Sequence, residues 1–432
     1  MPLRLDIRNA GFEKDFAAFL AARRDAAADV DREAAAIIAD IRTGGDRALA
    51  DYTRKLDRLD FADTPMAVSA DEIARAFDTV DPGTLDALKL AADRIRAHHQ
   101  RQRPQDHRYT DPLGVELGWR WTAVESVGLY VPGGTASYPS SVLMNAVPAR
   151  VAGVERIVMA VPAPDGRLNP LVLAAARLAG VDEIYRIGGA QAIAALAYGT
   201  ETITPVAKIT GPGNAWVAAA KRLVFGTVGI DMVAGPSEVL VIADGDNDPA
   251  WIAADLLAQA EHDTAAQSIL ITDDAGFGEA VAAAVDLQLS TLPRAETAAA
   301  SWRDHGAIID VEALDQAISL ADRIAPEHLE LAFDDADAFA GRIRNAGAIF
   351  VGRYTPEVIG DYVGGSNHVL PTARTARFSS GLSVLDFMKR TSILKLDAEQ
   401  LAQLGPAAIA LAGAEGLDAH ARSVSIRMNR LT

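Results

Sequence analysis

Residues 156–198 read RIVMAVPAPDGRLNPLVLAAARLAGVDEIYRIGGAQAIAALAY, and this stretch decides the fold. An apolar run is followed by an alanine-rich segment, a second apolar run and a second alanine-rich segment. A strand, a helix and a strand at this spacing form a βαβ unit, in which the two strands lie parallel in one sheet. The stretch therefore predicts an α/β protein.

The same alternation extends in both directions along the chain, while the first hundred residues and the last forty have helical patterns. Further strands are expected at 115–119, 125–131, 206–210, 238–243, 268–272 and 348–352. These strands are enough for two modest sheets with helices on their faces. Ser69 with Glu72 has the form of a capping box, and Asp81-Pro82 is a typical start for a longer helix that runs towards His99.

Length and charge exclude several classes of protein. The 432 residues are about three times a typical domain length, so at least two cores are expected. Lys and Arg number 41 against 58 Asp and Glu, a formal charge of −17 that repels phosphate backbones and anionic lipids. We therefore expect no nucleic-acid and no membrane partner. The start lacks the pattern of a signal peptide and no run of about 18 apolar residues occurs, which predicts a cytoplasmic protein.

Cysteine is absent, so a metal could bind only to histidine, carboxylate or amide groups. Eight histidines occur in the chain. Four of them lie in polar surroundings and are expected at the surface: His98, His99, His107 and His305.

Three turns have features of nucleotide-binding loops. Gly188–Gln191 and Gly211–Asn214 each follow a predicted strand and precede a predicted helix, where small residues let a phosphate approach backbone N–H groups. Neither completes G-x-G-x-x-G, because Ala190 and Trp216 occupy glycine positions. In the third turn, Tyr130 precedes Val-Pro-Gly-Gly and could stack on a ring. A plain strand-to-helix turn remains the alternative for each.

Candidate groups for acid–base chemistry surround a predicted strand after Pro326. Alternation places His328 and Glu330 on one face, with Leu329 and Leu331 on the other. Glu327 can point towards the same space as His328, and the two would form an acid–base pair. The alternative is an edge strand with a solvated polar face.

Candidate metal ligands lie in three separate segments. Gln259 and His262 are three residues apart on a predicted helix, so an amide oxygen and an imidazole can converge, although a solvated helix end is the alternative. Asp361 precedes a glycine-rich loop, and His420 follows Glu415 by five residues. Two nitrogen and two oxygen ligands would suit zinc best, with Mn²⁺ or Co²⁺ possible. Spacing alone does not show that these groups converge.

Several long strings together resemble the histidinol dehydrogenase family in content and order. They are YVPGGTASYPSSVLMNAVPARVAGV (130–154), KITGPGNAWVAAAKR (208–222), DMVAGPSEVLVIAD (231–244), QAEHDTAAQSILITDD (259–274), APEHLEL (325–331), GDYVGGSNHVLPTARTARFSSGLSVLDFMKRTS (360–392) and EGLDAH (415–420). The resemblance extends from roughly residue 30 to the C-terminus. It implies an NAD- and zinc-dependent dehydrogenase that oxidises L-histidinol to L-histidine through a bound aldehyde, with two NAD⁺ in succession, in the last two steps of histidine biosynthesis.

The resemblance also implies residue roles. The zinc ligands, one ion per subunit, would be Gln259, His262, Asp361 and His420. Glu327 and His328 would be the acid–base pair, and the NAD contacts would be Tyr130, Gln191 and Asn214. Substrate contacts would be Ser237, Gln259, His262, His328, Asp361, His368, Glu415 and His420. His328 would take the hydroxyl proton in the first oxidation, and Glu327 would deprotonate the water that adds to the aldehyde.

Pattern and resemblance together predict two incomplete Rossmann-like domains with parallel-rich sheets and small helical N- and C-terminal segments. The expected divisions are a helical segment 1–28, a catalytic α/β domain from 29–129 and 239–384, a nucleotide-binding domain 130–238 and a helical segment 385–432. The resemblance implies a homodimer in which the last segment completes the partner subunit's site.

Two departures from the family pattern, Trp216 and Ala207, leave details of the NAD pocket open. Three other functions are compatible with parts of the sequence. A relative that oxidises another amino alcohol or diol would share most motifs. A zinc hydrolase would need only Glu327 and the metal and would work without nucleotide. A non-catalytic metal- or nucleotide-binding scaffold would carry out no reaction.

Overall fold

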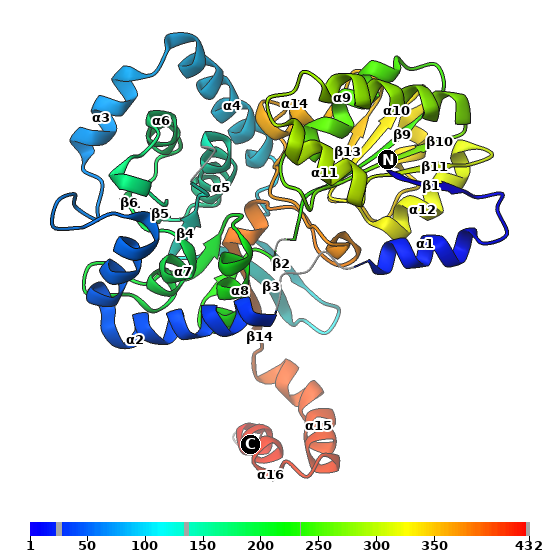
Figure 1. Cartoon of the computed structure of the whole chain (residues 1–432). Helices are drawn as coiled ribbons and strands as arrows, with labels where there is room; N and C mark the ends of the chain where they lie inside the picture. Colours follow the sequence, from blue (N-terminus) through cyan, green and yellow to red (C-terminus); the bar gives the residue numbers. More distant parts are fainter. Residues whose placement is uncertain (23–27, 134–137, 234, 429–432) are drawn as a thin grey trace. The chain divides into compact units, whose positions relative to one another are not determined.

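The computed structural model describes residues 1–22, 28–133, 138–233 and 235–428. The chain forms two compact units (Figure 1). The first comprises Met1–Gln102 and Glu125–Phe387, and the second comprises Arg103–Val124 and Met388–Thr432. In the described ranges, no helix is both long and apolar enough to cross a membrane.

A six-stranded parallel sheet forms one core of the first unit. Its order is β1-β11-β10-β9-β12-β13, with β1 Leu3–Asp6, β9 Glu238–Ala243, β10 Gln267–Thr272, β11 Ala307–Asp310, β12 His328–Ala332 and β13 Ala348–Val351. Strand β9, EVLVIA, is apolar after Glu238 because helices cover both faces of the sheet. Leu240 and Ile242 pack into one apolar cluster, whereas Val239 and Val241 pack into the other.

The helices of this core divide between the two faces. The cluster around Val239 includes residues of α9 Pro249–Ala260, α10 Ala275–Leu289 and α11 Ala295–His305. The cluster around Leu240 includes residues of α1 Phe12–Ala21, α12 Ala317–Ile324 and α13 Ala336–Ala340. Figure 1 shows α9 and α10 on one side of the sheet and α1 and α12 on the other.

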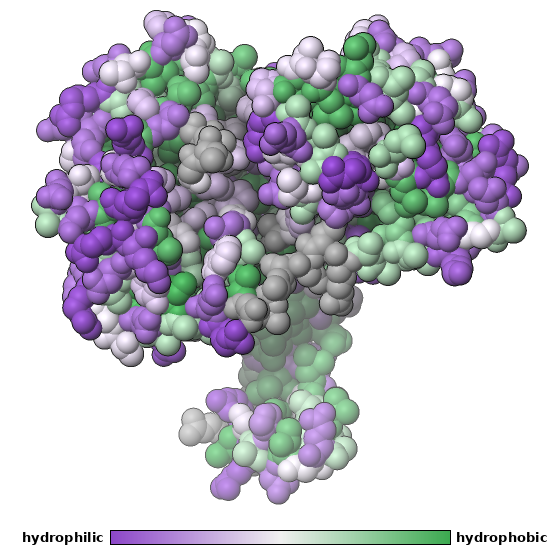
Figure 2. Space-filling view, viewed as in Figure 1, coloured by the Kyte–Doolittle hydropathy of each residue, from purple (hydrophilic) through white to green (hydrophobic). Residues whose placement is uncertain are grey.

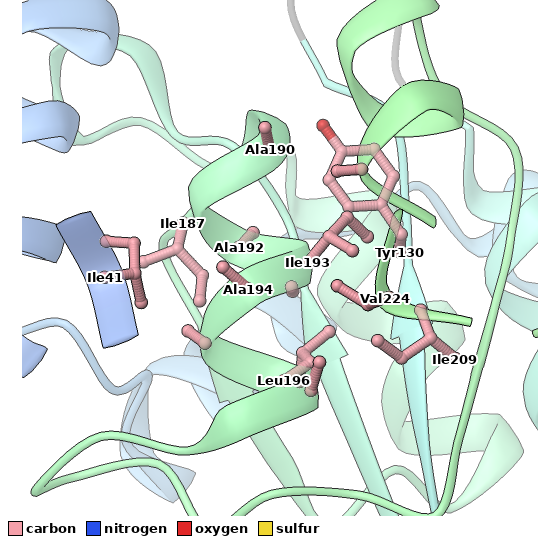
Figure 3. Close-up of a cluster of buried hydrophobic side chains, with 14 of the residues drawn as sticks. Ile41, Tyr130, Ile187, Ala190, Ala192, Ile193, Ala194, Leu196, Ile209 and Val224 are labelled. Atoms are coloured by element: carbon pink, nitrogen blue, oxygen red, sulfur yellow. The ribbon is translucent and has the colours of Figure 1, made fainter. Parts of the chain in front are cut away.

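A five-stranded parallel sheet forms the other core. Its order is β6-β5-β4-β7-β8, with β4 Ser126–Tyr130, β5 Arg156–Ala160, β6 Glu183–Tyr185, β7 Lys208–Thr210 and β8 Gly229–Ile230. Its helices are α2 Ala28–Asp57, α3 Ala70–Thr79, α4 Pro82–Gln100, α5 Pro139–Ala152, α6 Pro170–Ala179, α7 Gly189–Tyr198 and α8 Ala215–Val224. Ile41 of α2 joins the buried cluster with Ile193 of α7 and Val224 of α8 (Figure 3).

The second unit contains an antiparallel sheet and two helices. The sheet order is β14-β3-β2, from β2 His107–Thr110, β3 Glu116–Ala123 and β14 Met388–Lys395. The helices α15 Ala398–Ala414 and α16 Asp418–Met428 pack against each other. Both apolar and hydrophilic residues lie on their visible face (Figure 2).

The predicted α/β class, with two parallel sheets and helical segments near the termini, is confirmed. The capping box of Ser69 and the Asp81 cap are also present. The packing differs from the predicted divisions in several places. Residues 103–124, expected in the catalytic domain, belong to the second unit, and helices α3 and α4 pack against α6 and α5 of the five-stranded sheet. Strand β1 joins the six-stranded sheet beside β11, and neither strand was predicted. Helix α2 covers the five-stranded sheet, although the prediction grouped it with the other, because its buried face contacts α7 and α8.

The expectation for His99 was wrong. Its side chain is fully buried, and its Nδ1 lies 2.7 Å from the carbonyl oxygen of Ile95. The buried positions of α4 are Leu88, Ala91, Ala92, Ile95 and His99, which is the spacing of one helix face. His98 and His107 are exposed as expected.

Candidate active site

Strand β12 brings the predicted acid–base pair into the interior. It lies between β9 and β13, so it is not an edge strand, and all five of its residues are buried. The predicted alternation is present, since Leu329 and Leu331 belong to an apolar cluster that excludes His328. Glu327 and His328 are 5% and 3% exposed. The alternative of a solvated face is therefore excluded.

The backbone of Glu238 holds both members of the pair. Its N–H donates to Glu327 Oε2 at 2.9 Å, and its carbonyl oxygen lies 3.0 Å from His328 Nδ1. Glu238 begins β9 and His328 begins β12, so the pair lies at the amino ends of these parallel strands. Ser237 precedes Glu238 at the same edge and is partly buried.

Three carboxyl groups surround the His328 ring. Glu357 Oε2 and Glu327 Oε2 lie 3.6 Å and 3.8 Å from Nδ1, and Asp361 Oδ1 lies 3.4 Å from Nε2. Burial opposes a charged imidazole, but the carboxylates outweigh it and raise the pKa of His328 well above its usual value. The arrangement strengthens His328 as a proton acceptor.

The same burial makes the two glutamates weak acids. It raises the pKa of Glu327 to about 7 and that of Glu357 to about 8, although His328 acts in the opposite direction on both. For Asp361 the attraction to His328 outweighs burial, and the pKa is lowered. The site thus contains one carboxylate that stays charged, Asp361, and two glutamates whose pKa values lie near neutral pH.

Helix α14, Glu357–Tyr362, supplies two of these carboxyl groups. Glu357 and Asp361 are four residues apart, a spacing that places both side chains on one helix face. Glu357 was not among the predicted site residues. The signal that could have found it is this spacing to Asp361 within a helix that begins after Pro356.

Two more histidines interact with Asp361, and a buried amide precedes one of them along the chain. Gln259 is buried in the last turn of α9, and His262 follows in the next turn, exposed, with its N–H donating to the Gln259 carbonyl oxygen. His368 Nδ1 lies 3.1 Å from the Asp361 carbonyl oxygen. Desolvation lowers the pKa of His262 and of His368, and the negative charge of Asp361 opposes that shift in both.

The remaining predicted ligands belong to the second unit. Glu415 ends α15 and His420 lies in α16, and both are exposed. Within the described residues of this one chain, no three His, Asp or Glu side chains are arranged as a metal site. The donor types nevertheless suit zinc, because His262 and Asp361 interact and Gln259 lies in the adjoining turn.

Two of the predicted nucleotide turns lie where the strand order of the five-stranded parallel sheet reverses. After β4, strands β5 and β6 extend the sheet to one edge. The chain then returns, and β7 lies on the other side of β4. The carboxyl ends of two such strands border the usual crevice for a ligand. Tyr130 ends β4, and Gly211–Asn214 follows β7.

Hydrogen bonds fix several of the residues at these turns. The Gly189 N–H donates to Tyr130 Oη at 3.0 Å, and burial raises the pKa of Tyr130 to about 12, so the phenol stays protonated. Gln191 is buried, and its Oε1 has no hydrogen-bond partner in the part of the chain that the structure describes. Asn214 is exposed, and its Oδ1 caps α8 by accepting the Val217 N–H at 3.1 Å.

A family model for histidinol dehydrogenase matches residues 20–428. The chain belongs to the histidinol dehydrogenase family. It is 70% identical over 429 residues to histidinol dehydrogenase of Mesorhizobium japonicum, covering 99% of this chain and 100% of that protein. It is 72% identical over 418 residues to that of Brucella suis biovar 1, covering 97% of each. A crystal structure of histidinol dehydrogenase from Elizabethkingia anophelis matches with a TM-score of 0.95 and 36% identity, covering 100% of this chain and 98% of that one.

The structure shows where Ala207 and Trp216, the two departures from the histidinol dehydrogenase pattern, lie. Ala207 precedes β7, and its N–H contacts the carbonyl and hydroxyl oxygens of Ser126 at the amino end of β4. It therefore lies at the edge opposite the nucleotide turns. Trp216 lies on α8, and its Nε1–H donates to Glu33 Oε2 of α2 at 2.9 Å. Through this hydrogen bond the Trp216 ring connects α8 to α2.

Proposed function

We propose that this protein oxidises L-histidinol to L-histidine through a bound aldehyde, with reduction of two NAD⁺, in the last two steps of histidine biosynthesis. One observation supports the chemistry most strongly. Glu327 and His328 are buried together, and the backbone of a single residue, Glu238, contacts both. Family membership supports the choice of substrate.

His328 and Glu327 accept protons in different steps of the reaction. His328 in its neutral form accepts the hydroxyl proton as hydride leaves for NAD⁺, and the charged Asp361 carboxylate, 3.4 Å from its Nε2, stabilises the imidazolium that forms. Water then adds to the aldehyde, and Glu327 takes its proton. A general base works best with a pKa near the working pH, and burial gives Glu327 a pKa of about 7.

Zinc would be held by Gln259, His262, Asp361 and His420, one ion per subunit. Zinc, when bound, would orient the amine and imidazole of the substrate more than it would polarise the alcohol. The His262 ring and the Asp361 carboxylate are suitable donors that already interact electrostatically. Ser237, His368 and Glu415 would contact the substrate.

A homodimer with shared active sites accounts for the position of His420. The segment from residue 385 would complete the site of the partner subunit with Glu415 and His420. Both residues are exposed on α15 and α16, where Leu411, Leu417 and Ile426 are also exposed. Exposed apolar groups beside exposed polar ligands are typical of an interface.

NAD⁺ would bind at Tyr130, Gln191 and Asn214. The support is the place of Tyr130 and Asn214 where the strand order of the parallel sheet reverses, and the Oε1 of the buried Gln191, which has no hydrogen-bond partner among the described residues. The predicted division of the chain into a catalytic and a nucleotide-binding domain would follow these two sheets.

Purified protein supplied with zinc and NAD⁺ tests the proposal. L-Histidinol should drive NADH formation, a chelator should stop it and zinc should restore it. Turnover of other amino alcohols or diols but not of histidinol would identify a different substrate. Hydrolysis without nucleotide would point to a zinc hydrolase instead.

A further inference from the structure

A buried ion pair lies next to one of the nucleotide turns and has no part in the acid–base chemistry. Lys221 of α8 contacts Asp231, which follows β8, and their side chains are only 3% and 1% exposed. Val217, Ala220 and Val224 of the same helix belong to the apolar core. Burying two charges in such surroundings is unfavourable unless their remaining polar atoms are also satisfied.

Two of the three other hydrogen bonds that these side chains make go to one residue, Gly211. Lys221 Nζ donates to the Gly211 carbonyl oxygen at 3.0 Å. The Gly211 N–H donates to Asp231 Oδ2 at 2.8 Å. Asp231 Oδ1 also accepts the Met232 N–H at 2.7 Å. The two charged side chains therefore bind both the N–H and the carbonyl oxygen of Gly211, the first residue of the turn 211–214.

Gly211 in turn lies directly against the end of β4. Its φ is +112°, and a Cβ at this position would lie 2.1 Å from the Tyr130 carbonyl oxygen. At the other end of the turn, Asn214 caps α8, the helix that carries Lys221. The ion pair, the turn and Tyr130 thus form one closed set of contacts.

We propose that Lys221 and Asp231 are positioning residues that fix the turn 211–214 for a pyridine dinucleotide. Neither residue touches the cofactor; they act through Gly211, which sets the spacing between Tyr130 and Asn214. This inference rests on the proposed NAD⁺ site. It explains why two charges are retained in an otherwise apolar interior.

The variant Lys221→Met, which keeps most of the side-chain volume, tests the proposal in the zinc-loaded enzyme. Without the Lys221 ammonium group, the Gly211 carbonyl oxygen loses its hydrogen-bond donor and Asp231 loses its counter-charge. Gly211 should then no longer be held in one position. The KM for NAD⁺ and its Kd by calorimetry should rise about tenfold or more, while the KM for histidinol changes less than about twofold. Exchange of the Gly211 amide hydrogen should also become faster.

The matched control is Arg156→Met. Arg156 pairs with Glu183 at 2.6 Å in the same sheet, but at the amino ends of β5 and β6. This variant should leave NAD⁺ binding unchanged. If Lys221→Met does not fold, Asp231→Asn preserves the shape of the site and should show the same selective loss of NAD⁺ affinity.

A lower melting temperature with unchanged KM and Kd for NAD⁺ would overturn the positioning role, because the pair would then be only structural. Equal losses in NAD⁺ and histidinol binding would overturn it as well. Failure of the proposed function is distinguishable, since the wild type itself would then neither bind nor reduce NAD⁺.

Discussion

Replacing Glu327 by Gln should stabilise the protein at high pH although it removes a catalytic group. The carboxyl is 5% exposed, and burial raises its pKa from 4.5 to about 7. The folded state therefore holds this proton more tightly than the unfolded state does. As pH rises from about 4.5 to 7, the unfolded chain loses the proton first, and the wild type loses stability. Glutamine does not titrate, and its amide oxygen can still accept the Glu238 N–H.

The size of the effect follows from the shift in pKa. A change from 4.5 to about 7 corresponds to roughly 3 kcal/mol that the wild type loses relative to the variant above pH 7. The attraction between Glu327 and His328 is already included, because it lowers this pKa. For 432 residues that unfold as a unit, the change is roughly 3 °C in melting temperature.

Thermal unfolding of the chelated protein at pH 5 and pH 8 measures the difference. The melting temperature of Glu327→Gln minus that of the wild type should be larger by those few degrees at pH 8. The control is Glu155→Gln, a change at an exposed carboxyl that should give the same difference at both pH values. If the difference in melting temperature between Glu327→Gln and the wild type is no larger at pH 8 than at pH 5, the raised pKa of the buried Glu327 carboxyl is refuted.

Two further predictions address the shared site and the nucleotide turn. Mixed dimers of His328→Ala and His420→Ala chains should recover part of the activity that each variant lacks alone, because one hybrid site contains both histidines; assays before and after subunit exchange measure this, and no recovery would argue against a shared site. Gly211→Ala should destabilise the protein by at least about 2 kcal/mol and weaken NAD⁺ binding, because φ is +112° and the new Cβ would meet Tyr130; urea unfolding and NAD⁺ titration check it, and wild-type values in both would contradict it.

Local patterns were enough to predict the central strands. The apolar run 238–243 is β9, and alternation after Pro326 correctly separated His328 from Leu329 and Leu331. Strand β1 was missed because its four residues pair with β11, about 300 positions away along the sequence. Strand β11, which also pairs with β10, was missed as well. The apolar face of α2 was visible, but a pattern does not reveal which of two sheets will cover it.

The candidate site was only partly predictable for a similar reason. Glu327, His328 and Asp361 were identified, and the structure brings them together. Glu357 escaped notice because its spacing to Asp361 places both on one helix face but does not reveal that this face is buried, with Glu357 3.6 Å from an imidazole. The Lys221–Asp231 pair escaped notice because its ten-residue separation links a helix to the end of the next strand.

The stoichiometry of NAD⁺ reduction tests the central claim most directly. A limiting amount of L-histidinol should yield two NADH per molecule and one histidine in the zinc-loaded enzyme. Glu327→Gln should form the first NADH and then slow by about 10²-fold or more before the second. One NADH per histidinol in the wild type, with the aldehyde as the final product, would contradict the account.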